Sequence, residues 1–294
     1  MDPVGHYTLY GDLATRGTAG LAAILMAKGL SVELVEESSS LAMALAARAG
    51  RQDGPYLRTP EGFVLADSFA IREWLERVHP DPSLLPDAPV RRTCARVLED
   101  WVELWLPHWP RRSWSTLERL AGHIEAAGFL LGRRPTRPDR LLAAWLESDV
   151  LIHDHARDHL ARHAPRLVRF GEDLLAASDA EADDALDQGD VIPISLLGVL
   201  EEIAGDYHAY LALNHRSLKD REDEVLLDLG LGRRPLPVQE ECEVRRVVIG
   251  RELAALSRDV RRTVSEMLEP VGAWHALTLP PVLSEVDASD PRSL

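Results

Sequence analysis

Hydrophobic and polar residues follow two different periods in the first 79 positions of the chain. Apolar residues at positions 30, 32 and 34 alternate with polar ones, which is the two-residue period of a strand. Over positions 18–28 the apolar side chains recur every three or four residues, and Gly29 follows where a left-handed residue commonly ends a helix. Similar segments predict strands at 7–10, 56–59 and 63–66 and helices at 41–49 and 68–78, in the order β-α-β-α-β-β-α.

Four prolines between His79 and Pro89 separate this α/β region from the rest of the chain. Proline has no backbone N–H and interrupts helices, so we interpret this stretch as a linker. Beyond it the apolar spacing is mostly helical, and Thr136 followed by Asp139 predicts a capped helix start. We expect helices at 194–218 and 238–268, a loop at 178–190 and a short strand pair at 225–231. The predicted domains are 1–79 (α/β), 80–89 (linker), 90–177 (helical) and 178–294 (mostly helical extension).

Composition and charge narrow the possible functions. Lys and Arg total 33 and Asp and Glu total 48, a net charge of −15 that argues against nucleic-acid binding. With 2 cysteines the chain cannot build a disulfide framework or a four-cysteine zinc site, so we expect a reducing, cytoplasmic environment. We see no signal-peptide pattern and no apolar run of the ~20 residues that span a bilayer, and therefore expect no membrane association.

Two short segments carry candidate chemistry. Gly54-Pro55 directly precedes a predicted strand, where a proline in a compact α/β unit is a candidate for a cis peptide bond. Asp67-Ser68 opens a predicted helix, so a hydroxyl and free N–H groups would gather at a helix N-terminus, which suits a carboxylate ligand. The alternative is an ordinary hairpin followed by an ordinary N-cap, since Asp and Ser are common caps.

A histidine cluster raises the question of a metal site. His155, His159 and His163 share one helical face at a spacing that can hold a metal ion. Neighbouring arginines indicate a solvated face of mixed charge instead, and we identify no second segment that supplies the remaining ligands. We therefore predict no metal.

The ordered set of these segments resembles the glutathione transferases. The resemblance is carried by Leu9-Tyr10-Gly11, a helix ending Lys28-Gly29-Leu30, the Pro55 strand, Asp67-Ser68-Phe69-Ala70-Ile71, the proline-rich linker, and Leu130 to Thr136 with Asp139. It covers residues 5–175, and residues 206–277 look like the extension of longer bacterial members. It implies an α+β thioredoxin-like N-terminal domain followed by an all-α glutathione-transferase-type C-terminal domain with a mostly helical extension.

The resemblance also implies a glutathione site. Asp67 and Ser68 match the residues that bind the γ-glutamyl end of glutathione, and Gly54 with Pro55 matches the backbone that pairs with its cysteinyl part. Counted without gaps from the first strand, the Ser or Cys that stabilises the thiolate falls on Thr15, which could equally be a loop or cap residue. A catalytic Tyr would fall on Gly11, which has no side chain.

From the family we expect a transferase for which glutathione is the cosubstrate. The enzyme would promote attack of the thiolate on a small apolar electrophile, in a homodimer. Trp101, Trp105 and His108 would line the electrophile pocket, although large aromatic residues at helical spacing also fill protein cores. Two alternatives stay open: a non-catalytic member that binds ligands or proteins, and glutathione-dependent reduction of peroxides at the same site.

Overall fold

The computed structural model describes residues 5–36, 38–52, 54–108, 114–176, 189–228, 230 and 232–282. The chain forms two compact units, each built from two segments. The first unit comprises 1–85 and 128–187, and the second comprises 86–127 and 188–294. Each domain expected from the sequence is one continuous stretch of the chain, whereas each of these units combines two stretches that are separated in the sequence.

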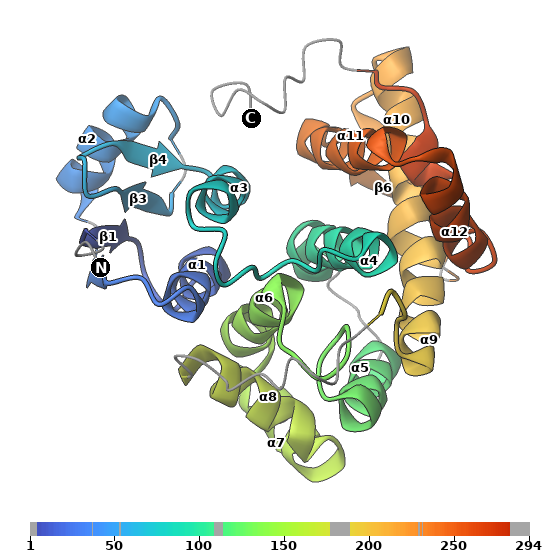
Figure 1. Ribbon diagram of the computed structural model, residues 1–294, viewed down its shortest axis with the longest axis horizontal. Coiled ribbons are helices and arrows are strands. Elements are labelled where there is room, and N and C mark those ends of the chain that lie inside the picture. The colour runs from blue at the N-terminus through green and yellow to red at the C-terminus, as the bar shows by residue number, and fades with distance from the viewer. Residues whose placement is uncertain are drawn as a thin grey trace. The chain divides into compact units, whose positions relative to one another are not determined.

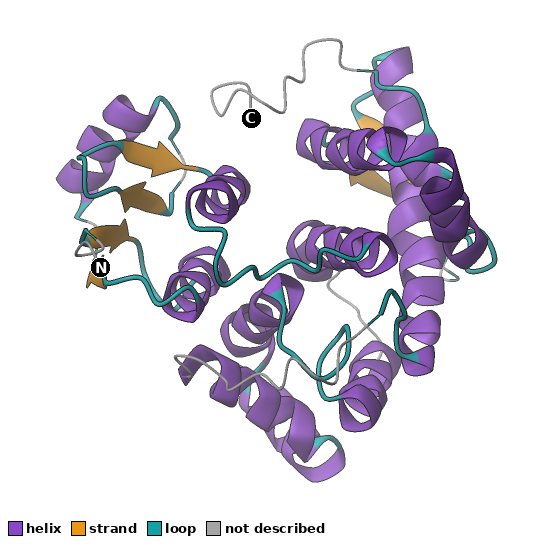
Figure 2. Cartoon of the chain, in the orientation of Figure 1, coloured by secondary structure: helices purple, strands orange, loops and turns teal. Residues whose placement is uncertain are grey.

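The first unit begins with the predicted order of strands and helices (Figures 1 and 2). Its sheet has the strand order β2-β1-β3-β4, with β1 parallel to β2 and β3 antiparallel to both of its neighbours. A βαβ unit joined to a ββα unit in this order is a thioredoxin-like fold, as the sequence predicted. The elements are β1 (Tyr7–Tyr10), α1 (Arg16–Ala27), β2 (Val32–Val35), α2 (Ser39–Ala49), β3 (Tyr56–Arg58), β4 (Val64–Ala66) and α3 (Ser68–Val78).

One of the two inner strands of the sheet, β1, is buried over its whole length. Leu9 of β1 pairs with Leu57 of β3, and neither side chain is exposed to solvent. Tyr10 faces a cluster that includes Leu45 of α2 and Tyr56 of β3. Both faces of β1 are covered, so all four of its residues are buried, the polar Thr8 included.

The first unit also contains helices from the middle of the chain. Gly20 lets α1 approach α6 closely, because a Cβ built on this glycine would lie 3.0 Å from Leu141 Cδ2. α6 is therefore packed directly on the helix that opens the thioredoxin-like part. The elements of this segment are α6 (Arg137–Trp145), a π-helical turn η3 (Leu146–Val150), α7 (Asp154–His163) and α8 (Pro165–Ala176).

A capping box starts α6, as predicted from Thr136 and Asp139. The fully buried Asp139 carboxylate accepts hydrogen bonds from the Thr136 N–H at 2.7 Å, the Thr136 hydroxyl at 2.6 Å and the Leu130 N–H at 2.7 Å. The Asp139 side chain therefore accepts the N–H of the N-cap residue of α6 and also holds the preceding loop at Leu130.

Lys28 ties the proline-rich segment to the first unit. Its buried Nζ donates to the carbonyl oxygens of His79 at 2.7 Å and Pro82 at 3.0 Å, and lies 3.0 Å from Glu76 Oε2. The other oxygen of Glu76 accepts from the Ser83 hydroxyl and the Leu84 N–H. The chain after α3 is thus held by buried charge, and Leu84 belongs to the core.

The second unit is mainly helical. Asp190 returns to cap the first helix of this unit, accepting hydrogen bonds from the N–H groups of Val90 at 2.9 Å and Arg91 at 3.0 Å. The first-segment elements are α4 (Pro89–Asp100), a π-helical turn η1 (Trp101–Trp105), η2 (Leu106–His108) and α5 (Trp114–Ala127); the second-segment elements are α9 (Ile194–Ile203), η5 (Ala204–His208), α10 (Ala209–Asp220), β5 (Glu224–Asp228), β6 (Arg233–Pro237), α11 (Glu240–Ala255), α12 (Arg258–Leu268) and η6 (Ala276–Thr278).

The extension agrees with the sequence predictions in kind and differs in detail. The helix expected at 194–218 is present with a π-helical turn at its centre, whereas the one expected at 238–268 is broken between Ala255 and Arg258. The strand pair is longer than predicted. Its two strands, β5 and β6, pair antiparallel and together reach from Glu224 to Pro237. Most of the loop expected at 178–190 lies outside the described residues. Within the described ranges, every helix falls short of the length and apolar character needed to cross a membrane.

The capping box predicts a measurable loss of stability. Replacing Asp139 by Ala would leave the buried N–H groups of Leu130 and Thr136 without their acceptor, so we expect the free energy of unfolding to fall by ~2–4 kcal/mol. Urea unfolding followed by circular dichroism measures this change. Asp173→Ala, which removes an exposed carboxylate from α8, is the control and should change stability by less than about 0.5 kcal/mol. Equal stability of the two variants would contradict this account of the loop.

Candidate functional site

Three loops of the first unit meet at one end of its sheet because of the strand register. Tyr10 pairs with Tyr56, and Tyr56 pairs with Ala66. The residues just beyond these pairs are therefore neighbours: the loop after β1, Gly54-Pro55 before β3, and Asp67-Ser68 after β4. The sequence-predicted residues of the first unit come together here.

Gly54-Pro55 has the predicted cis peptide bond. Pro55 is buried, and a Cβ built on Gly17 would lie 3.3 Å from its Cδ atom, so the first turn of α1 packs on the proline ring. Gly54 is exposed beside it. The backbone ahead of β3 thus lies next to the N-terminal end of α1.

Thr15 is the N-cap residue of α1 and is exposed. Its hydroxyl does not cap the helix; it donates to the Asp12 carbonyl oxygen at 2.7 Å and lies 3.0 Å from Thr18 Oγ1. The Thr15 hydroxyl therefore does not occupy the N–H groups of the first turn, which lie at the positive end of the helix dipole.

Position 11 has no room for a side chain. Gly11 has a φ of +149°, and a Cβ built on it would collide with the buried hydroxyl of Thr18. Tyr10 points to the α2 side of the sheet, where it is buried. A tyrosine hydroxyl from this strand is therefore not part of the site, in agreement with the sequence analysis.

The start of α3 combines a strained residue with a polar pair. Asp67 has a φ of +74°, which is uncommon for a residue other than glycine and which clusters at ligand sites. Its Oδ1 accepts from the N–H groups of Phe69 at 2.9 Å and Ala70 at 3.0 Å, and its Oδ2 lies 3.0 Å from the Arg51 guanidinium. The side chain predicted as an N-cap is one, and it is paired with a cation as well.

Ser68 is the first residue of α3 and is half-buried. Its Oγ accepts a hydrogen bond of 2.7 Å from the guanidinium of the buried Arg72. Arg51 and Arg72 were missed in the sequence analysis. The spacing of Ser68 and Arg72, one helical turn apart, could have indicated the second contact, whereas nothing local places Arg51 beside Asp67.

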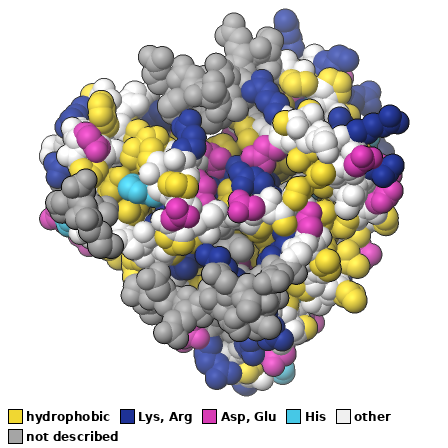
Figure 3. All heavy atoms as spheres, in the orientation of Figure 1, with side chains coloured by type: hydrophobic (Ala, Val, Ile, Leu, Met, Phe, Trp, Pro, Cys, Tyr) yellow, Lys and Arg dark blue, Asp and Glu magenta, His cyan; other side chains and the backbone are white. Residues whose placement is uncertain are grey.

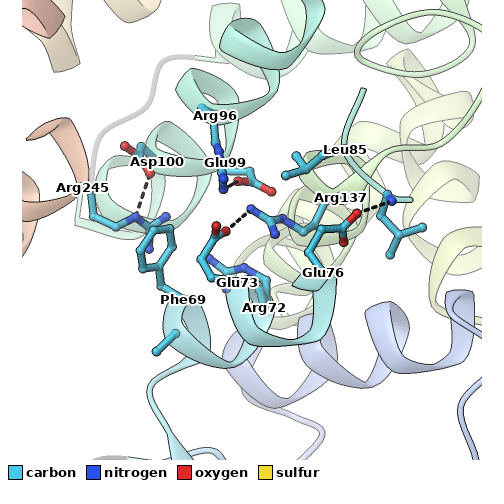
Figure 4. A network of polar contacts seen from close by, with 12 residues as sticks. Phe69, Arg72, Glu73, Glu76, Leu85, Arg96, Glu99, Asp100, Arg137 and Arg245 are labelled. Atoms are coloured by element: carbon cyan, nitrogen blue, oxygen red, sulfur yellow. Dashed lines mark hydrogen bonds and ion pairs between the residues drawn. The ribbon is translucent and has the colours of Figure 1, made fainter. Parts of the chain in front are cut away.

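Ion pairs between buried cations and half-buried carboxylates hold α3 in place. Glu73 accepts from Arg137 of α6 at 2.7 Å, and Figure 4 shows the two side chains directed at each other. Glu76 on the same helix pairs with Lys28, the residue that follows α1. α6 and the end of α1 thus fix the helix that presents Ser68.

No protein-family model and no curated protein matches this chain. Solved structures do. A glutathione S-transferase from Rhodospirillum rubrum F11 is 22% identical, with 60% of this chain and 94% of that chain covered and a TM-score of 0.46. One from Methylobacterium radiotolerans, in complex with glutathione sulfonate, is 28% identical over 58% and 91% of the chains, with a TM-score of 0.41. A maleylacetoacetate isomerase from Anaeromyxobacter dehalogenans with bound GSH is 22% identical over 60% and 98%, with a TM-score of 0.39.

The chain is similar to glutathione S-transferases. The strand order of the first unit, and not this similarity, establishes its thioredoxin-like fold. These three structures cover 58–60% of this chain.

Two of the residues expected in a glutathione transferase's electrophile pocket are core residues of the second unit. Trp101 is fully buried and Trp105 is 4% exposed. The Trp105 ring centroid lies 5.6 Å from that of Tyr207 and 5.2 Å from that of Tyr210. This is the core-packing alternative of the sequence analysis, and the pocket role stays a prediction. His108 ends a short helix, and its side chain lies outside the described residues.

The polar face of α4 carries ion pairs that the sequence analysis did not single out. Arg245 of α11 donates to Asp100 at 2.8 Å and to Glu103 at 2.7 Å, and the first of these contacts is drawn in Figure 4. Arg96 donates to Glu252 at 2.8 Å. Through these contacts the extension is joined to the first helix after the linker.

The histidines of α7 form no metal centre with other groups in the described ranges, where no three side chains of His, Cys, Asp and Glu are placed to hold a metal ion. The rings of His159 and His163 stack at 4.6 Å between centroids. Acidic and basic side chains are interspersed on the face drawn in Figure 3.

Both cysteines are buried and free. Cys94 of α4 is fully buried and Cys242 of α11 is 1% exposed. Burial raises the pKa of each thiol to about 12, with nearby carboxylates adding to the effect. Neither thiol has the ionised, accessible character of a reactive cysteine.

We therefore expect the native protein to be inert toward thiol reagents. A pKa of about 12 leaves roughly one thiol in ten thousand ionised at pH 8, and both thiols are shielded. Ellman's reagent should titrate neither cysteine in the native protein and both in guanidinium chloride. Rapid release of colour from the native protein would contradict this expectation.

Proposed function

We propose that this protein binds glutathione through its first unit and promotes attack of the glutathione thiolate on a small apolar electrophile. The observation that carries the proposal is the meeting of three loops at one end of the sheet. The N-terminus of α1, the exposed backbone at Gly54 and the N-terminus of α3 face the same neighbourhood. Each offers hydrogen-bonding groups suited to a different part of an extended, charged tripeptide.

Each group has a role that follows from its chemistry. The Ser68 hydroxyl and its N–H suit the γ-glutamyl carboxylate, because both are donors at the positive end of a helix. Gly54, whose backbone is exposed, suits pairing with the cysteinyl residue. That pairing would bring the sulfur toward the first turn of α1, where Thr15 lies.

The proposed chemistry needs deprotonation and positioning. A free thiol has a pKa of about 8.5, and N–H groups at a helix N-terminus lower it by stabilising the thiolate. The thiolate sulfur then forms a bond to the electrophilic carbon as the leaving group departs with its electron pair. The protein holds the two reactants together and needs no metal. Trp101, Trp105 and His108 remain the sequence-based candidates for the electrophile pocket.

A second candidate function is binding of glutathione without turnover. It is favoured by the Thr15 hydroxyl, whose single proton has two acceptors within the protein, the Asp12 carbonyl oxygen at 2.7 Å and Thr18 Oγ1 at 3.0 Å. A hydroxyl that donates to either of them does not donate to a thiolate. Catalysis by Thr15 requires its side chain to turn from Asp12 to the sulfur.

The remaining family expectations belong to this proposal. We propose a homodimer in the cytoplasm, which acts on a small molecule and not on nucleic acid. The net charge of −15 supports the last point, because such a surface repels a phosphate backbone. The buried, un-ionised cysteines are compatible with a reducing compartment.

Glutathione binding can be measured by calorimetry. The wild-type protein should bind glutathione, and Ser68→Ala should weaken binding by ~1.5–3 kcal/mol, the range for a hydrogen bond to a charged group. Ser265→Ala, which removes an exposed hydroxyl bonded to the Arg262 carbonyl of α12, is the control and should bind like wild type. Absence of binding by the wild type, together with no rise in Tm at millimolar glutathione, would refute the proposed function.

Turnover separates the two candidate functions. If Thr15 stabilises the thiolate, Thr15→Val should lower kcat for conjugation of an aryl halide by roughly 10–100-fold, with the dissociation constant of glutathione unchanged. Thr263→Val, which removes another exposed hydroxyl that donates to a carbonyl, should leave kcat unchanged. Equal activity of the Thr15 variant would remove Thr15 from the mechanism. Binding without any conjugation by the wild type would favour the non-catalytic function.

A further inference from the structure

We propose that the site at the start of α3 selects its ligand by a carboxylate and is indifferent to the neighbouring ammonium group. This inference rests on the proposed function, since the γ-glutamyl end of glutathione carries both groups on one carbon. It assigns positioning roles to Arg51 and Arg72, which act through Asp67 and Ser68.

The Asp67 carboxylate is already used by the protein. One oxygen accepts two helix N–H groups, from Phe69 and Ala70, and the other lies 3.0 Å from the Arg51 guanidinium. The side chain of Asp67 is 15% exposed. An ammonium group that reached the second oxygen would lie beside the guanidinium, and the repulsion between the two cations would offset its attraction to the carboxylate.

The Ser68 hydroxyl keeps its proton available for a ligand. A guanidinium has donors and no acceptor, so the 2.7 Å contact from Arg72 to Ser68 Oγ makes that oxygen an acceptor. The hydroxyl proton must then point elsewhere. Arg72 is fully buried and lies one turn along the same helix, which fixes this arrangement.

The two contacts together define the ligand class. Ser68 provides a directed O–H donor and a helix N-terminal N–H, and both suit a carboxylate. Asp67 adds little to the binding of a cationic ligand group, because Arg51 already offsets its charge. The ligands expected are thiols that carry a carboxylate at the γ-glutamyl position, whether the adjacent amino group is free, acylated or absent.

Two analogues of glutathione test this directly by calorimetry on the wild-type protein. Glutaryl-Cys-Gly keeps the carboxylate and lacks the amino group, and we expect its dissociation constant to lie within about threefold of that of glutathione. The 4-aminobutanoyl analogue keeps the amino group and lacks the carboxylate, and we expect it to bind at least tenfold more weakly. A tenfold loss for glutaryl-Cys-Gly would overturn the inference and leave the proposed function standing.

Arg51→Gln tests the reason for the indifference. Without the guanidinium, the second oxygen of Asp67 is free to pair with an ammonium, so the variant should prefer glutathione over glutaryl-Cys-Gly by at least threefold more than the wild type does. Arg48→Gln is the matched control: Arg48 lies in the same unit and donates to the Gly62 carbonyl, so its loss should leave the preference unchanged. The same change in both variants would overturn the role of Arg51. Failure of wild type to bind glutathione would refute the proposed function itself, which distinguishes the two failures.

Discussion

The register of the antiparallel strands is the constraint on which the candidate site depends. Pairing of Tyr56 with both Tyr10 and Ala66 makes neighbours of three loops that lie far apart in the sequence. A shift of β3 by one residue would turn its buried side chains to the opposite face and separate Pro55 from Asp67. The register is held by the core, since Leu9 and Leu57 are fully buried opposite one another.

Buried charge, rather than apolar packing alone, supports the helix that presents Ser68. Lys28, just after α1, and Arg137, at the start of α6, reach α3 and pair with Glu76 and Glu73. Removing one partner of a buried pair leaves an uncompensated charge, which costs far more than the pair itself contributes. These pairs therefore specify where α3 lies, and with it the position of a binding group.

At the start of α3 the Asp67 carboxylate makes its contacts within the protein. Asp67 must satisfy helix N–H groups while its backbone adopts a positive φ, and Arg51 balances its charge. The neighbouring serine is left as the donor because Arg72 occupies its oxygen. Two arginines therefore give the adjacent residues Asp67 and Ser68 different roles. Arg72, one helical turn away, contacts Ser68, and Arg51, in the loop before β3, contacts Asp67.

Local sequence patterns determined the elements of this protein and the chemistry of its loops. The period of apolar residues placed the strands and helices of the first 79 positions, and Thr136 with Asp139 identified the start of α6, because caps and amphipathic faces are properties of contiguous residues. Gly54-Pro55 and Asp67-Ser68 were recognised for the same reason. Nothing local predicted that residues 128–176 pack with the N-terminal part or that Arg51 faces Asp67, and local spacing left both a core and a pocket role open for Trp101 and Trp105. Those features depend on contacts between residues distant in the chain, which only the tertiary structure brings together.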